Sequence, residues 1–137
     1  MTGPEAFAFL ARAVPLPLAG LEALALALRA DSRELLGPHP DRPLEAGLET
    51  WPPHPERNPT LAVEAASPLA FCGWKGARLG NLASVNIWLT AAVLGPETRD
   101  AAVAFAGWWE RTPHAEGRPA LLAAVEKAVE ARKAAAA

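Results

Sequence analysis

Apolar side chains occupy nearly every face of the helix that residues Leu82 to Leu94 would form. Asn81 stands before this segment, and Gly95-Pro96 follows it. Glycine just past one helix and proline at the start of the next are common stop and start signals. Because a helix that is apolar all round is normally buried by other helices, we expect this segment to lie at the centre of the fold.

The rest of the pattern predicts further short helices that are separated by prolines. Leucines recur at helical spacing through much of the chain, whereas the alternation of apolar and polar residues that is typical of strands is not sustained. The predicted helices cover residues 4–10, 18–36, 43–50, 59–66, 68–79, 81–94, 96–111 and 119–132.

These elements predict an all-α protein, a compact bundle of about seven or eight short helices around the central apolar helix. Stacked antiparallel helix pairs are one arrangement of such a bundle. The chain has 137 residues, which favours one domain over residues 1–133, with a frayed alanine tail at 134–137.

Apolar stretches are too short or too broken to span a bilayer, and the N-terminus lacks the basic start of a secretory signal. We therefore expect a cytoplasmic protein; its oligomeric state is left open.

Charge and cysteine content exclude several classes of function. The formal net charge is -2, and the basic residues are scattered, whereas a nucleic-acid partner calls for a basic patch. Cys72 is the single cysteine, which excludes an internal disulfide and a cysteine-rich zinc site. Its neighbours are apolar, so we expect a packed thiol and no nucleophile. No cofactor and no metal are expected.

The histidines are candidates for catalysis, as are carboxylate pairs at helical spacing, which we expect to form solvated faces. His39-Pro40-Asp41 is the tripeptide by which J-domain co-chaperones stimulate their ATPase partner, but the preceding helix is apolar where a J-domain is basic. We expect a turn in which Asp41 caps the following helix. His39, His54 and His114 each adjoin a proline, without the spacing of metal ligands, and are expected to be solvated in loops. No catalytic residue is assigned; an enzyme that uses the loop histidines and Asp41 stays the least favoured alternative.

Adjacent tryptophans on one helix suggest a binding surface. Trp108 and Trp109 point about 100° apart on a helix, so both are buried only if that helix packs on two sides. Otherwise one is exposed, and exposed tryptophans mark protein interfaces. The candidate partner-binding residues are therefore Trp108, Trp109 and Phe105, with burial in the core as the alternative.

A second set of residues suggests a small-ligand pocket. Trp74 and Trp88 flank a glycine-rich corner that also carries Lys75 and Arg78. Helices around a tryptophan-lined cavity can hold an apolar or aromatic ligand. A plain corner between two helices is the alternative interpretation.

Several segments, taken in order over residues 11–94, resemble an uncharacterised bacterial helical family whose genes are often found beside type VI secretion genes. The matching segments are Ala11-Arg12-Ala13-Val14-Pro15, residues 51–58 (WPPHPERN), the alanine-rich residues 62–66, Ser67-Pro68 and Trp74. The chain departs from that family in lacking paired tryptophans in the second helix and a Ser-Gly-Gly turn after the fifth. The family has no known catalytic residues, so the resemblance implies only an accessory role near a secretion apparatus.

The chain has many predicted helices and aromatic residues but no recognisable set of catalytic side chains. This combination favours a non-enzymatic function. The leading hypothesis is a protein-interaction module, an adaptor or chaperone of a bacterial secretion or contractile system, whose partner is another protein. The alternatives are a small-ligand-binding helical protein with a Trp-lined pocket and an immunity or antitoxin protein.

Overall fold

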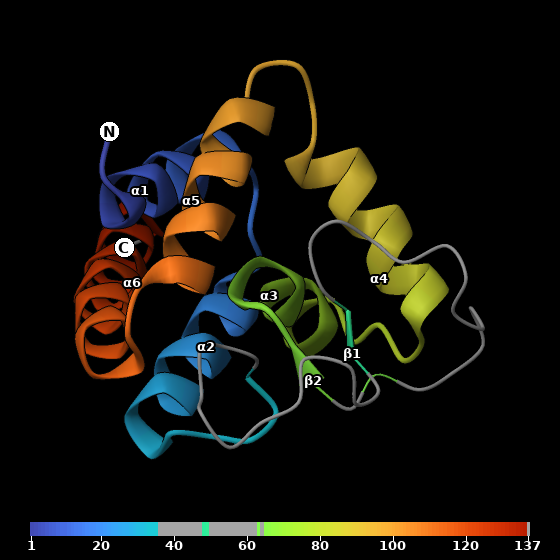
Figure 1. Cartoon of the computed structure of the whole chain (residues 1–137). Coiled ribbons are helices and arrows are strands. Elements are labelled where there is room, and N and C mark those ends of the chain that lie inside the picture. Colours follow the sequence, from blue (N-terminus) through green and yellow to red (C-terminus); the bar gives the residue numbers. More distant parts are fainter. Residues whose placement is uncertain (36–47, 50–62, 64, 137) are drawn as a thin grey trace.

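The computed structural model describes residues 1–35, 48–49, 63 and 65–136 (Figure 1). Most of these residues are helical, and a mostly α-helical compact fold is confirmed; the six α-helices among them are slightly fewer than the seven or eight predicted. The elements are α1 (Gly3–Ala13), α2 (Leu18–Ala30), β1 (Leu48–Glu49), β2 (Ala65–Ala66), α3 (Pro68–Gly76), α4 (Leu82–Trp88), a π-helical turn (Leu89–Val93), α5 (Arg99–Arg111) and α6 (His114–Ala136).

Local signals place the starts of the first two helices near the predicted residues 4 and 18, although α1 runs to Ala13, past its predicted end at residue 10. Thr2 caps α1, because its hydroxyl accepts a hydrogen bond from the Glu5 amide while the Glu5 carboxylate accepts one from the Thr2 amide. The helix ends at Val14, just before Pro15, since the residue before a proline is biased away from helical dihedrals. Pro17 then stands directly before α2.

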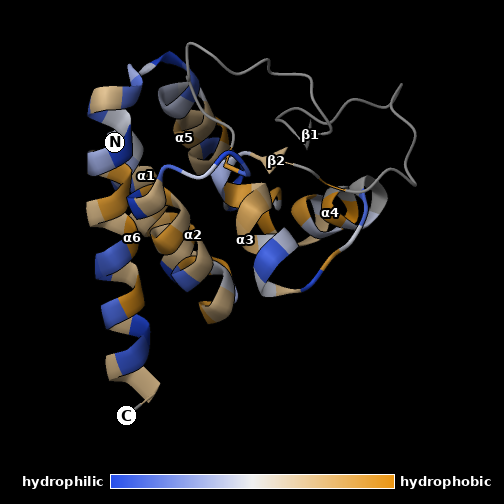
Figure 2. Ribbon diagram, turned by 90° about the horizontal axis from the view of Figure 1, so that it is seen from below, coloured by the Kyte–Doolittle hydropathy of each residue, from blue (hydrophilic) through white to orange (hydrophobic). Residues whose placement is uncertain are grey.

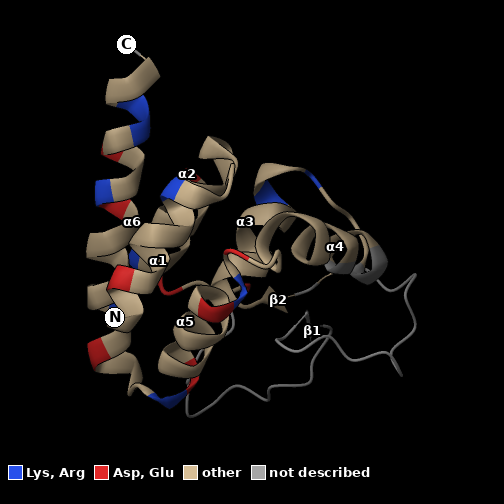
Figure 3. Ribbon diagram, turned by 90° about the horizontal axis from the view of Figure 1, so that it is seen from above, with Lys and Arg blue, Asp and Glu red and all other residues tan. Residues whose placement is uncertain are grey.

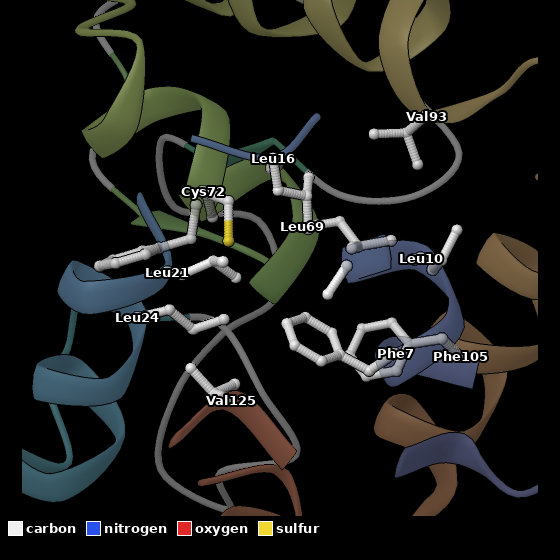
Figure 4. Packing of buried hydrophobic residues seen from close by; sticks show 14 of the residues in the cluster. Phe7, Leu10, Leu16, Leu21, Leu24, Leu69, Cys72, Val93, Phe105 and Val125 are labelled. Carbon is white, nitrogen blue, oxygen red and sulfur yellow. The ribbon is translucent and has the colours of Figure 1, made fainter. Parts of the chain in front are cut away.

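Helices α1, α2, α5 and α6 share one core, in which α1 packs on α5 and α6 while α2 packs on α3 and α6. Figure 4 shows Phe7 of α1 facing Phe105 of α5, with ring centroids 5.4 Å apart, and leucines of α2 facing Val125 of α6. Hydrophilic and hydrophobic bands alternate along α6, whose C-terminal end extends past the other helices (Figure 2). No helix in the described ranges is long and apolar enough to cross a lipid bilayer.

The prediction that residues 82–94 form the central helix was wrong. This segment consists of α4 and the π-helical turn, and it lies at one side of the molecule against α3 (Figure 1). Val85, Leu89 and Val93 are buried, but Ile87 is 69% exposed. Burial of all faces needs neighbours on all sides, whereas α3 is the main α-helical neighbour of α4; α1 and α2 each pack against two other helices.

Three segments predicted as helices differ in the structure. Asp31 adopts a left-handed φ of 52° and ends α2, which was predicted to reach residue 36. Leu35 instead forms a parallel bridge with Ala66. β1 pairs with β2 in parallel, in the register Leu48 with Ala65, within segments predicted as helices 43–50 and 59–66. Val63, within the second of these segments, is buried and not helical. The remaining residues of those two predicted helices, and His39-Pro40-Asp41 and His54, lie outside the described residues.

The last two helices begin at other positions than predicted. A turn at Gly95–Thr98 precedes α5, which therefore starts at Arg99 and not at Pro96. α6 starts at His114, five residues before the predicted Pro119, and Pro119 lies inside its second turn. The helix runs to Ala136, past the predicted end at residue 132. Fraying of the alanine tail stays a prediction.

Candidate functional site

The predicted partner-binding residues of α5 are mostly core residues. Phe105 is 1% exposed and Trp109 is 2% exposed. Trp108 is half-buried and covers Gly3 of α1, where an added Cβ would lie 2.1 Å from the indole ring. The helix is thus packed on two sides, as the alternative interpretation requires. Phe105 and Trp109 offer no exposed surface, and a partner-binding role for Trp108 stays a prediction.

A small cavity lies beside Trp109, between α3, the π-helical turn and α5. Its volume is about 20 Å³, and it is lined mainly by apolar groups, among them Leu69, Val93 and Phe105. Such a space is about one water molecule in size. It cannot hold a metabolite.

The predicted ligand-pocket residues contact the chain itself. The Lys75 ammonium lies 4.1 Å from the ring centroid of Trp74 and 2.9 Å from a carboxylate oxygen of Glu34. Trp88 covers Gly73, where an added Cβ would lie 2.4 Å from the indole ring. Arg78, at a φ of 56°, is exposed after the end of α3. Neither the cavity beside Trp109 nor the groove described below is lined by these four residues, and their ligand-binding role stays a prediction.

His114 is not the solvated loop residue that the sequence predicts. It opens α6, and its Nε2 lies 3.0 Å from Oδ1 of Asp31 at the end of α2. One turn further on, the Arg118 guanidinium donates a hydrogen bond to the Leu28 carbonyl oxygen. These contacts join the end of α2 to the start of α6. Sequence analysis missed them because no local pattern relates residues so far apart along the chain.

Nothing in the described residues forms a recognisable reaction centre. No group of three or more His, Cys, Asp or Glu side chains among them could hold a metal ion. Cys72 is fully buried, and removal of the thiol from water raises its pKa to about 12. A thiol with that pKa is protonated at neutral pH and inert as a nucleophile.

A second and larger recess is an open groove of about 780 Å³ between α1 and α6. Most of the lining residues have small side chains, and four have long charged ones. The lining residues are Pro4, Glu5, Ala8, Ala11, Arg12, Val14 and Pro15 from the α1 side, and Ala120, Ala123, Ala124, Lys127, Ala128, Ala131 and Arg132 from α6. We call this surface the α1–α6 groove.

Charged side chains of the α1–α6 groove are mostly basic. Arg12, Lys127 and Arg132 oppose the single carboxylate of Glu5, which leaves three minus one, or +2, on a chain of net charge -2. In the described part of the chain, none of the three basic groups is in an ion pair. Elsewhere on α6, by contrast, Lys133 pairs with Glu22.

The sequence pattern does not single out this groove. Alanines at 120, 123, 124, 128 and 131 look like ordinary helix formers beside the leucine stripe of α6. The one available signal was their recurrence at three- and four-residue spacing next to isolated basic residues. That signal has meaning only once α1 is known to lie alongside.

No protein-family model, curated protein or solved structure matched the chain.

Proposed function

We propose that the chain is a non-enzymatic protein-interaction module whose α1–α6 groove receives a segment of another protein. The observation that carries this proposal is the groove itself, an open recess of about 780 Å³ with small side chains on both walls. Large side chains would fill such a recess from within the chain. Alanines leave it available to side chains of a partner.

The composition of the groove favours a protein over a small molecule. Its volume is within the range of ligand pockets, which are typically enclosed and lined by hydrophobic and aromatic side chains with a few convergent polar groups. This groove is open, and its lining contains no aromatic residue and no neutral polar side chain. The Trp-lined pocket remains the alternative, and the ion pair and ring contacts of Lys75 at that corner do not favour it.

The partner is proposed from the resemblance of residues 11–94 to the family encoded beside type VI secretion genes. It implies an adaptor or chaperone that acts in the cytoplasm on a component of a bacterial secretion or contractile system. An immunity or antitoxin protein would use the same groove and differ only in its partner.

Site-specific photocrosslinking in cells tests this proposal. A benzophenone amino acid is placed at Ala131, which is exposed in the groove, and for comparison at Ala104, which is also exposed but lies on α5 outside it. We expect one defined protein adduct from position 131 and none from position 104. The adduct should disappear when Ala123→Phe fills the groove. Adducts of equal yield from both positions, or an adduct indifferent to Ala123→Phe, would contradict the proposed site.

A further inference from the structure

We infer that the segment received by the α1–α6 groove is an acidic amphipathic helix. This inference rests on the proposed interaction function and adds the conformation and charge of the partner segment. Three features carry it: the walls of the groove, its length, and the signs of its charges.

Both walls of the groove are α-helices, which limits how a partner can bind. Helical backbone groups are already hydrogen-bonded within each helix, so an extended peptide would find no open sheet edge to pair with. A polyproline segment needs an aromatic-lined groove, and this lining has no aromatic residue. Of the common modes of peptide recognition, a helix laid in a groove is the one that fits.

The length of the small-residue wall sets the length of the partner helix. From Ala120 to Ala131 there are 11 residue steps, or about 17 Å at 1.5 Å per residue. That corresponds to roughly three helical turns. Alanine walls let a second helix come close, because the distance between helix axes depends on the side chains at the contact.

Basic side chains stand on both walls, which argues that the partner helix is acidic on its flanks. Arg12 comes from α1, while Lys127 and Arg132 come from α6, and none is in an ion pair within the described residues. An amphipathic helix with small apolar residues on one face and carboxylates beside them would satisfy both walls. Complementary charges of this kind raise the association rate and fix orientation.

Glu5, the single acidic residue of the groove, lies at the end away from Lys127 and Arg132. Gly3 of α1 contacts Trp108 near the end of α5, and Thr112, which follows α5, contacts Gly117 near the start of α6. Glu5 therefore lies at the end where α6 begins, and its carboxylate already accepts a hydrogen bond from the Thr2 amide. Apart from Arg118, the basic residues of α6 lie in its C-terminal half (Figure 3). The carboxylates of the partner are expected at that half.

Selection from a displayed library of helical peptides tests the inference, with the full chain as target. We expect enriched helices to carry Asp or Glu beside a small apolar face. Their affinity should vanish with Ala123→Phe and fall about tenfold with Lys127→Glu/Arg132→Glu, because attraction becomes repulsion at two sites. Arg33→Glu/Arg99→Glu is the matched control. Both residues are exposed and lie outside the groove, and the two substitutions change the net charge as much as Lys127→Glu/Arg132→Glu does. It should alter affinity by less than about twofold. Circular dichroism verifies that each variant is folded.

The possible failures are distinguishable. Enriched helices that are neutral or basic, yet are blocked by Ala123→Phe, would overturn the acidic partner and leave the proposed function intact. Helices that bind regardless of Ala123→Phe would overturn the groove as the interaction site and the proposed function with it.

Two rival occupants are checked in parallel with the free protein. Sedimentation showing a dimer that Ala123→Phe dissociates, or flotation with phosphatidylglycerol vesicles that Ala123→Phe abolishes, would assign the groove to a second copy or to a lipid surface and overturn the inference.

Discussion

Gly20 of α2 lies directly against the main chain of Cys72 in α3, so close that a Cβ on Gly20 would stand 2.3 Å from the Cys72 carbonyl oxygen. Gly76, at the end of α3, meets the same stretch of α2, and a Cβ there would lie 2.7 Å from the Gly20 amide nitrogen. The crossing of α2 and α3 therefore depends on two residues without side chains. It also places the Cys72 side chain in the core (Figure 4).

Gly20→Ala should destabilise the fold, although alanine is the better helix former by about 1 kcal/mol. The added methyl group meets main-chain atoms, which cannot move aside as a flexible side chain could, and overpacking of this kind costs about 1–3 kcal/mol or more. We expect a net loss of roughly 2 kcal/mol, measured by urea unfolding with tryptophan fluorescence. Gly80→Ala is the control, because nothing lies within 4 Å of its added Cβ. Equal stability of the two variants would contradict the close crossing.

Cys72 should make the protein sensitive to alkaline pH. Burial raises the pKa of its thiol from 9.0 to about 12. Below pH 9 the thiol is neutral in both the folded and the unfolded chain, and its effect on stability is constant. Between about pH 9 and pH 12 the unfolded chain loses the proton while the folded chain keeps it. The free energy of unfolding should therefore fall by about 1.4 kcal/mol for each pH unit from this residue.

Two measurements check the cysteine prediction. In urea unfolding from pH 8 to pH 11, the wild type should lose stability more steeply than Cys72→Ala, which removes the titrating group. Thiolate absorbance near 240 nm should be absent from the folded protein at pH 10, and the chain has no tyrosine to obscure it. A native thiol that ionises near pH 9 would refute the burial.

Removal of the cap of α1 should weaken the helix that forms one wall of the groove. Thr2→Ala loses the hydrogen bond that the Thr2 hydroxyl accepts from the Glu5 amide, at 3.2 Å. Loss of an N-cap costs about 1 kcal/mol. Thr2→Ser keeps the hydroxyl and should restore most of that stability in the same thermal unfolding experiment. If serine and alanine proved equally destabilising, the capping box would not be the cause.

Two apolar residues of α5 should respond very differently to truncation. Phe105→Ala removes a ring that is 1% exposed and packs on Phe7, so a loss of about 3–5 kcal/mol is expected. Val103→Ala, at a position 46% exposed, should change stability by less than about 0.5 kcal/mol. Chemical denaturation of both variants provides the comparison. A small effect at Phe105 would return that residue to the set of candidate partner contacts.

Local chemistry predicted several elements well. The start of α3 at Ser67-Pro68 follows from steric and hydrogen-bonding effects that act within a few residues. The lack of a sustained alternation of apolar and polar residues likewise predicted few strands. The overall helical class was accordingly predictable.

The candidate site could not be predicted in the same way. Phe105 and Trp109 were singled out for their residue types, but both are buried in the tertiary structure, where Phe105 packs on Phe7 of α1. The alanines of α6 do not by themselves predict a groove, because a small residue forms a groove only when a neighbouring helix provides the second wall. The pairing of His114 with Asp31 likewise joins two helices that are distant along the chain.

The sequence by itself determined where α1 and α3 begin and that the fold is helical, since caps, prolines and apolar spacing act over a few residues. Tertiary structure alone decided that Leu35 and residues 48–49 pair with 65–66, that Ile87 stays exposed on an apolar helix, and that α1 and α6 enclose a groove. Burial and pairing depend on which surfaces meet. That is a property of the whole packed chain, and no short window of its residues contains it.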